Sequence, residues 1–315
     1  MYRNPPDPPA PPQSPEREKS FVERHRIHPV VFAVISLAAV FVLYQVIAGT
    51  ITFLLVGGST VNRENVNLLR LLTVAGQIFC ILIPTIILAR LFSRRPSAEV
   101  FSWRIPSLAE TVYALLGLVV LQQIFQIYLF FQDLIPVPDF LERILDPFKE
   151  KLEEMFRELV RANDLPELSF VLLVVAVVPA VVEELLFRGL IQKSLEKAVP
   201  AIQAALLSGI IFGMYHFNPF AVVPLVGLGC YFGFLRYRSA SIVIAMTAHF
   251  LNNALAALAV YFQMEHETIL GAQPDIEPNI VSILVQLLLY LTLFFLTFYG
   301  YLRATLKIGP HANEV

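Results

Sequence analysis

Long stretches without a charged side chain are the feature that most limits what this chain can fold into. Each of five runs can cross a hydrocarbon core of about 30 Å as a helix, namely Val30–Val56, Leu71–Ala89, Thr111–Gln132, Ser239–Met264 and Pro278–Leu302. Only 15% of the 315 residues are charged, whereas soluble domains carry about 25%. The sequence therefore predicts an all-α, polytopic membrane protein.

Two further segments raise the expected number of crossings to about eight. Ala198–Leu235 lacks Asp, Glu, Lys and Arg, and as one helix it would measure roughly 57 Å at 1.5 Å per residue. That length is too great for one crossing, so we expect a pair of helices there. Leu168–Ile191 supplies the eighth helix and contains two glutamates.

The distribution of Lys and Arg predicts the orientation of the chain. Basic residues concentrate in alternate loops and at both ends, and the positive-inside rule then places both termini in the cytoplasm. We expect a multi-pass protein of the cell (inner) membrane. Residues 1–29, rich in proline and then in charge, are expected to form a disordered cytoplasmic tail.

The remaining chain divides into three parts. Residues 30–166 hold the N-terminal transmembrane helices and an amphipathic helix. Residues 167–262 form the intramembrane core, and residues 263–315 form a loop, the last transmembrane helix and a C-terminal tail.

The loop before the core, residues 133–167, does not follow the charge pattern of the other loops. Its apolar residues repeat at helical spacing across 139–163, among seven acidic residues between Asp139 and Glu158. Asp146 and Pro147 resemble an N-cap and a first-turn proline. We expect an amphipathic helix pair in the membrane interface, which serves either for packing or as a lid or substrate guide.

Several functional classes receive no support from the composition. The net charge is −2 and no basic groove is apparent, so we expect no nucleic-acid partner. Cys80 and Cys230 lie in apolar runs, where a small buried hydrophobe is the usual role. The spacings Gly209-x-x-x-Gly213 and Gly229-x-x-x-Gly233 predict close helix approach.

Two adjacent glutamates lie inside an apolar helix, in the sequence Glu183-Glu184-Leu-Leu-Phe-Arg188. An ionisable group at membrane depth costs about 2.5–3.5 kcal/mol on insertion scales, which points to function. Glu184 and Arg188 are four residues apart and share a helix face, so they can pair. Glu183 lies about 100° around the helix and is free to face a cavity as a general base.

Two other segments place polar groups in apolar helices, Phe212-Gly-Met-Tyr-His216 and His249-Phe-Leu-Asn-Asn253. In each, the outer residues are four apart and lie on one face. The turn at Asn218-Pro219 leaves a short helix after it, so we expect the turn to lie within the membrane beside a wet cavity. That position would bring His216 towards Glu183.

In these three motifs and their order, the chain resembles the CPBP intramembrane proteases, the family of type II CAAX prenyl endopeptidases and bacteriocin-processing proteins. That family's pattern is Glu-Glu-x-x-x-Arg, then Phe-x-x-x-His, then His-x-x-x-Asn, with a small residue as the alternative at the last position. Gly189 and the Ser208-Gly-Ile-Ile-Phe212 segment also match, and the similarity covers roughly residues 168–256.

The resemblance implies an eight-helix membrane protease that opens to the cytosol and cuts a membrane-associated peptide or protein. It implies that Glu183 and His216 activate a water, while His249 and Asn253 stabilise the oxyanion. Glu184, Arg188 and Phe212 would support them. A prenylated C-terminus is the substrate that the family's founding activity suggests.

Other mechanisms and functions stay open at this point. Glu and His side chains are acceptable zinc ligands, although the chain has no His-Glu-x-x-His and the family resembled is treated as glutamate-dependent; we expect no cofactor. Ser208 and the two cysteines are poorly placed as nucleophiles. Outside enzymes, the chain could be an immunity or scaffold factor, or a transporter with a proton relay through Glu183.

Overall fold

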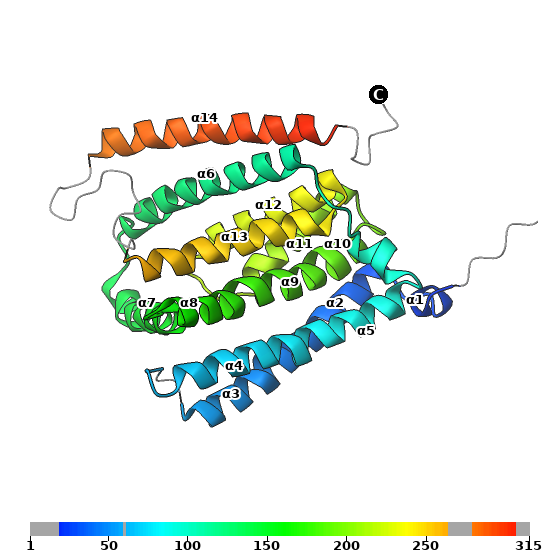
Figure 1. The fold of residues 1–315 in the computed structure, drawn as a ribbon, viewed down its shortest axis with the longest axis horizontal. Coiled ribbons are helices and arrows are strands. Elements are labelled where there is room, and N and C mark those ends of the chain that lie inside the picture. Colours follow the sequence, from blue (N-terminus) through cyan, green and yellow to red (C-terminus); the bar gives the residue numbers. More distant parts are fainter. Residues whose placement is uncertain (1–18, 59–60, 264–278, 307–315) are drawn as a thin grey trace, which may run out of the picture.

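Every regular element in the described part of the chain is a helix. The computed structural model describes residues 19–58, 61–263 and 279–306, and Figure 1 shows their course from blue to red. The α-helices (α) and π-helical stretches (η) are α1 (Phe21–Arg24), α2 (Pro29–Phe41), η1 (Val42–Ala48), α3 (Gly49–Val56), α4 (Val66–Gly76), η2 (Gln77–Leu82), α5 (Ile83–Phe92), η3 (Ser97–Phe101), α6 (Leu108–Asp133), α7 (Asp139–Val160), α8 (Leu165–Leu172), η4 (Leu173–Val177), α9 (Val178–Glu184), η5 (Leu185–Ile191), α10 (Gln192–Leu195), α11 (Ala201–Met214), α12 (Val222–Ser239), α13 (Ile242–Tyr261) and α14 (Ile280–Ala304). The predicted all-α class is confirmed.

Six continuous helices in the described residues are long and apolar enough to cross a membrane. They are Pro29–Val56, Val66–Phe92, Leu108–Asp133, Leu165–Leu195, Ile242–Tyr261 and Ile280–Ala304. Each corresponds to one predicted segment, which confirms a polytopic membrane protein. The run 198–235 is a pair of helices, as predicted, but α11 has only 14 residues and α12 has 18.

The helix α8–α10, which carries the two glutamates, lies near the middle of the bundle (Figure 1). Helix α13 packs against α9 and α12, and α14 packs against α6 on one side. The helices from α2 to α5 cover the other side of α9 and α10. Large apolar side chains such as Leu54, Phe79 and Leu288 are exposed on the outer helices, as a lipid-facing surface requires.

Glycines allow α11 and α12 to pack backbone against backbone. A Cβ atom on Gly209 would clash with the backbone of Cys230, and one on Gly229 would clash with the backbone of Gly209. A Cβ atom on Gly233 would lie 2.6 Å from the carbonyl oxygen of Ala205. Small residues at helix contacts permit this approach, so the predicted packing role of these glycines is confirmed.

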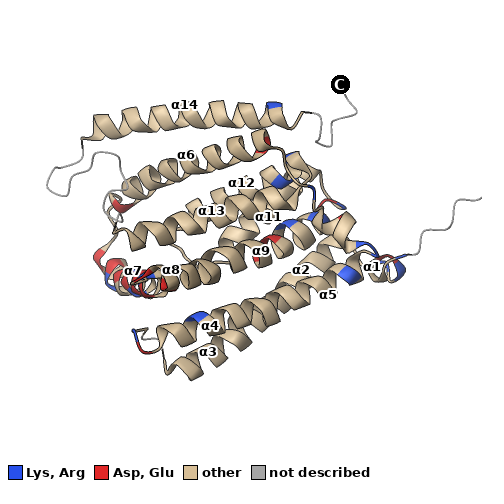
Figure 2. Cartoon of the chain, viewed as in Figure 1, with Lys and Arg blue, Asp and Glu red and all other residues tan. Residues whose placement is uncertain are grey.

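Helix α7 lies at the end of the bundle away from α1 and runs across the long helices (Figure 1). It is amphipathic, and its acidic and basic residues appear together in Figure 2. However, it is one 22-residue helix with Pro147 inside it, so the predicted pair is wrong. Pro147 leaves the carbonyl of Arg143 without its helical donor, and that exposed residue can hydrogen-bond to solvent instead.

A buried arginine anchors the C-terminal end of α7. Arg70 of α4 is fully buried and donates to the carbonyl oxygens of Leu159 at 3.0 Å and Arg161 at 2.6 Å. It also pairs with Glu167 of α8 at 2.8 Å. Cations at a helix C-terminus are stabilising, so Arg70 fixes α7 to the helix that carries the glutamates.

Residues 19–29 are ordered, with α1 among them, although the sequence placed residues up to 29 in a disordered tail. Ser20 and Glu23 form a reciprocal capping box at α1, and Val22 is buried in the core. These local bonds and this apolar contact offset the entropy of ordering the segment. Residues 1–18, 59–60, 264–278 and 307–315 lie outside the described residues, and with them most of the predicted tail and the loop before α14.

Candidate active site

A polar stripe runs along one face of the helix α8–α10. Glu184, Arg188 and Gln192 are four residues apart, so their side chains share a face, and all three are fully buried. Arg188 donates to Glu184 Oε1 at 3.1 Å and to the carbonyl oxygen of Gly229 at 2.8 Å. The stripe therefore faces α12 at the point where glycines keep α12 close.

His249 of α13 joins this ion pair. Its Nδ1 lies 2.9 Å from Glu184 Oε1, and its ring is stacked on Phe232 with a centroid separation of 5.2 Å. Because Glu184 Oε1 also accepts from the Arg188 guanidinium, the hydrogen in the contact with His249 belongs to Nδ1. Two donors, Arg188 and His249, thus share one buried carboxylate oxygen.

The ring of Phe212 connects all three sequence motifs. The guanidinium carbon of Arg188 lies 4.4 Å from its centroid, a distance suited to a cation–π contact. The rings of His216 and His249 lie 4.6 Å and 5.6 Å from it, both edge to face. Phe212 is itself buried. Its ring therefore packs against both imidazoles and keeps them close together.

His216 lies where α11 ends. Its Nδ1 is 2.8 Å from the carbonyl oxygen of Phe212, and since a carbonyl only accepts, Nδ1 carries the hydrogen. The next residue, Phe217, has a φ of 51°, a left-handed conformation that is uncommon outside glycine. This conformation turns the chain sharply away after His216 and leaves the histidine exposed.

Short helices bring His216 to the depth of the glutamates. Glu183 is 12 residues before Leu195, the end of α10, or about 18 Å along the axis at 1.5 Å per residue. Helix α11 starts at the same end of the bundle, and its 14 residues span about 21 Å. The two side chains therefore lie at similar distances from that end.

Glu183 has surroundings unlike those of Glu184. It is partly buried, and its Oε2, like that of Glu184, is a buried oxygen without a hydrogen-bond partner in the described part of the chain. No hydrogen bond joins it to either histidine among those residues. The phenol of Tyr44 on η1 lies within electrostatic range of its carboxylate.

Asn253 lies one turn beyond His249 on α13. It contacts η4, which belongs to the same continuous helix as the two glutamates. Its Nδ2 donates to the carbonyl oxygen of Val175 at 2.9 Å. Pro179 has no N–H, so the carbonyl four residues before it, that of Val175, lacks its α-helical donor. The Asn253 amide supplies a hydrogen bond in its place.

The structure therefore brings five of the seven predicted site residues into direct contact, namely Glu184, Arg188, Phe212, His216 and His249. Glu183 and Asn253 lie beside this cluster, on the same helices, without a direct bond to it. Gln192, Gly229 and Phe232 also belong to the site and were missed. The four-residue spacing after Arg188 could have indicated Gln192, whereas Phe232 gives no such signal.

The zinc alternative does not fit these side chains. Within the residues that the structure describes, no three His, Cys, Asp or Glu side chains are grouped so that they could hold a metal ion. Structural and catalytic zinc sites need three or four such protein ligands, and Glu184 is already engaged by Arg188. We therefore assign no step to a metal ion.

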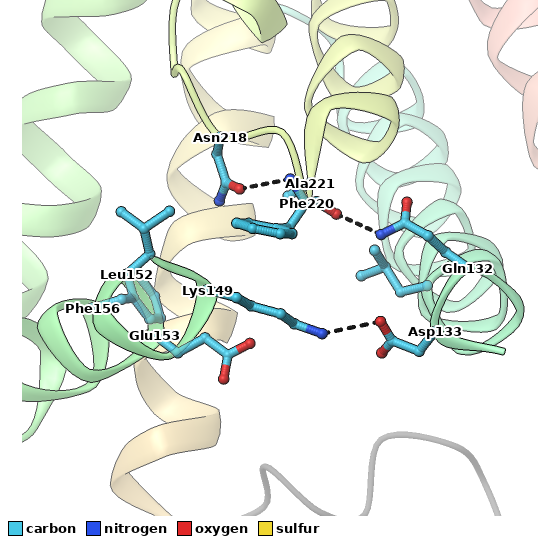
Figure 3. Close-up of a pocket in the computed structure, with 10 residues that line it drawn as sticks. Gln132, Asp133, Lys149, Leu152, Glu153, Phe156, Asn218, Phe220 and Ala221 are labelled. Atoms are coloured by element: carbon cyan, nitrogen blue, oxygen red, sulfur yellow. Dashed lines mark hydrogen bonds and ion pairs between the residues drawn. The ribbon is translucent and has the colours of Figure 1, made fainter. Parts of the chain in front are cut away.

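A cavity of about 340 Å³ lies next to the turn that follows His216. Figure 3 shows it between the end of α6, helix α7 and the turn. Gln132 donates to the carbonyl oxygen of Phe220 at 2.9 Å, and Lys149 of α7 pairs with Asp133 of α6 at 3.0 Å. Helix α7 thus forms one wall of a partly apolar cavity beside the turn after His216, and His216 itself is not among the residues that line it.

Comparison with models of known protein families gives a match that covers this site. Residues 165–255 match the family model described as type II CAAX prenyl endopeptidase Rce1-like. No curated protein and no solved structure gives a match. The matched segment begins at the first residue of α8, ends within α13 and contains every predicted site residue. Over residues 165–255 this chain is therefore similar to the Rce1-like family of type II CAAX prenyl endopeptidases.

Proposed function

We propose that this chain is an intramembrane endopeptidase that hydrolyses a peptide bond of a membrane-associated substrate with Glu183 as the general base. The observation that carries the proposal is the difference between the two adjacent glutamates. Oε1 of Glu184 is bonded to both Arg188 and His249, whereas no hydrogen bond or ion pair of Glu183 is seen among the described residues. Oε2 is buried without a partner in both glutamates. Carboxylates in contrasting environments are suited to different catalytic roles.

His216 is suited to hold the attacking water with Glu183. Its Nδ1–H is occupied by the carbonyl of Phe212, so in the neutral ring Nε2 is an acceptor. A water between Nε2 of His216 and the Glu183 carboxylate would donate a hydrogen bond to each. That arrangement aims a water lone pair at the substrate carbonyl carbon.

His249 is suited to stabilise the oxyanion. Its Nδ1–H is committed to Glu184, so Nε2 becomes a donor when the ring carries both protons. The Glu184 carboxylate is the counterion that such a ring needs. Donors fixed before the reaction at the place where negative charge develops are worth several kcal/mol of barrier.

The reaction balances with these groups alone. Glu183 takes one proton from the water as the water oxygen bonds to the carbonyl carbon, and the carbonyl oxygen becomes an oxyanion. The oxyanion then collapses and the carbon–nitrogen bond breaks, while the proton on Glu183 passes to the leaving amine. The products are a carboxyl group and an amine, and Glu183 is again a carboxylate.

Comparison of membrane proteins from living cells tests this function. Membranes from cells that carry the native chain, the Glu183→Gln chain or the Glu150→Gln chain would be analysed by quantitative peptide mass spectrometry. Glu150 is exposed on α7, so its substitution controls for the chemical change itself. We expect at least one uncut peptide to accumulate only with Glu183→Gln. Identical peptide profiles for all three chains would contradict the proposal and favour a scaffold role.

Metal removal tests the mechanism separately. The peptide found in that comparison would be synthesised with a fluorophore and a quencher on either side of the cut bond. We expect the purified protein to cut it at an unchanged rate after treatment with a chelator. Activity that is lost with the chelator and restored by zinc would show that the metal alternative is right.

A further inference from the structure

A row of three hydrogen-bonded side-chain amides connects α6 to the continuous helix Leu165–Leu195, which carries the two glutamates. Gln122 Nε2 donates to Asn252 Oδ1 at 3.0 Å, and Asn252 Nδ2 donates to Asn253 Oδ1 at 3.0 Å. Asn253 Nδ2 then donates to the carbonyl oxygen of Val175 at 2.9 Å. These hydrogen bonds join α6, α13 and η4, which all belong to helices long and apolar enough to cross a membrane.

The direction of this row of amides is fixed from one end. The Val175 carbonyl can only accept, and Pro179 leaves it without its own helical donor, so the amide nitrogen of Asn253 must face it. Asn253 Oδ1 therefore faces Asn252, which has to present its nitrogen. Asn252 Oδ1 in turn needs a donor, and Gln122 provides it.

From this geometry we infer that Gln122 and Asn252 are positioning residues, which hold the Asn253 amide in the orientation that leaves its second N–H free for the reaction. The inference rests on the proposed function, because it gives Asn253 a donor role beside His249. One hydrogen of Asn253 Nδ2 is used by Val175, and one is left. Without Asn252, Asn253 Oδ1 would lack its donor, and the amide could rotate away.

A purely structural role for Gln122 predicts a different result from a positioning role. Bonds that only join α6 to α13 stabilise the protein whatever residue stands at position 253. A residue that acts through Asn253 has no effect on the reaction once Asn253 is gone. A double-mutant cycle separates the two roles, because it measures this dependence directly.

The cycle uses Gln122→Met, Asn253→Ala and the double variant, with the quenched peptide described above as the probe. Methionine keeps the length of glutamine and removes the donor. We expect Asn253→Ala to lower kcat by about 10²–10³-fold, as for an oxyanion donor. Gln122→Met should lower kcat roughly five-fold, the effect of about one neutral hydrogen bond, with KM unchanged. The double variant should equal Asn253→Ala alone.

Gln123→Met is the matched control, since Gln123 is the neighbouring glutamine on α6 and no hydrogen bond of its side chain is seen within the described residues. We expect it to leave kcat unchanged. Asn252→Leu provides a second route through the row of amides and should also lose its effect in the Asn253→Ala background. Thermal unfolding in detergent would show that each variant is folded.

Three results would overturn the inference. They are an equal loss from Gln122→Met in the native and Asn253→Ala backgrounds, an equal loss from Gln123→Met, and full activity of Asn253→Ala. The proposed function fails separately, either through cleavage by Glu183→Gln or through identical peptide profiles for the native and Glu183→Gln chains.

Discussion

At the scale of single residues, the buried pair between Glu184 and Arg188 has no exposed side-chain surface on either partner. Arg188 is held further by the Gly229 carbonyl and the Phe212 ring. A buried pair is weak evidence for stability as a whole, but the removal of one partner leaves an uncompensated charge. The pair is therefore a place where one substitution has a large effect.

We predict that Arg188→Met lowers the free energy of unfolding by about 3–5 kcal/mol, the usual cost of breaking a buried pair. It should also abolish cleavage, because Glu184 then loses the partner that holds it against His249. Chemical unfolding in detergent, followed by circular dichroism, measures the first effect.

Arg161→Met is the control for that measurement. Arg161 pairs with Glu158 at 3.4 Å, but its side chain is 56% exposed, and exposed pairs contribute at most about 1 kcal/mol. Equal losses of stability for the two variants would show that the Glu184–Arg188 pair has no special role.

How far the sequence predicted the site depends on how local each contact is. The pairing of Glu184 with Arg188 follows from a four-residue spacing, so it could be predicted without a structure. The bond of His249 to Glu184 spans 65 residues, and that of Asn253 to Val175 spans 78. Such bonds depend on how helices pack, and the sequence pattern indicated only that the polar groups need partners.

At the scale of elements, the α11–α12 pair positions His216 and also supplies the Gly229 carbonyl to Arg188. Both functions require the close backbone contact at Gly209. We predict that Gly209→Ala separates the two helices, since its Cβ would clash with backbone atoms. The expected loss is about 1–3 kcal/mol of unfolding free energy, as for other overpacked sites, together with a reduced kcat.

Gly49→Ala is the comparison for this prediction. Gly49 also lies in a helix, and the nearest atom to an added Cβ is 3.8 Å away, which is an ordinary contact. Alanine favours a helix over glycine by about 0.5–1 kcal/mol, so this variant should be at least as stable as the native chain. A Gly209→Ala protein as stable as Gly49→Ala would contradict the packing argument.

The elements also show where pattern reasoning fails. The 38 uncharged residues of 198–235 predicted a pair correctly, because no single helix of that length fits a membrane. The Asp146-Pro147 signal wrongly divided α7, since proline is acceptable in a helix when the carbonyl that it frees can face solvent. An Asp-Pro pair is therefore weaker evidence for a helix boundary in an exposed helix such as α7 than in a buried helix.

At the scale of the whole molecule, the charge distribution and the family resemblance predict different sides of the membrane for the opening of the cavity near His216. The cavity beside the turn after His216 lies at the end of the bundle with α7, away from α1 and the C-terminal part of α14 (Figure 1). If both termini lie in the cytoplasm, as the distribution of Lys and Arg predicts, this cavity opens on the outer side. The resemblance to CPBP proteases implies a cytosolic opening, so both expectations cannot describe this cavity.

Cysteine labelling in intact cells decides the direction. Glu150→Cys on α7 and Arg95→Cys between α5 and η3 lie at opposite ends of the bundle, and both positions are exposed. From the positive-inside rule we predict that a membrane-impermeant maleimide labels Glu150→Cys directly and Arg95→Cys only after permeabilisation. The native chain, with Cys80 and Cys230, gives the background. The reverse pattern would place both termini outside the cytoplasm.

The class of the molecule was predictable from the apolar runs, because only a helical bundle satisfies so many backbone groups in lipid. The order of the helices in space was not, since large apolar side chains occur both in the core and on the outer surface. Glu184, Arg188 and His249 are buried and mark the interior. Together with Glu183, His216 and Asn253 they were the residues on which the prediction of a shared site depended.

The central claim is that Glu183, and not its neighbour Glu184, is the base of a hydrolytic site. The most direct measurement compares purified native and Glu183→Gln proteins in detergent, with the quenched peptide as substrate and thermal unfolding as the control for folding. The account predicts no detectable cleavage by Glu183→Gln and an unfolding midpoint equal to that of the native protein. Cleavage by Glu183→Gln at the native rate would contradict it.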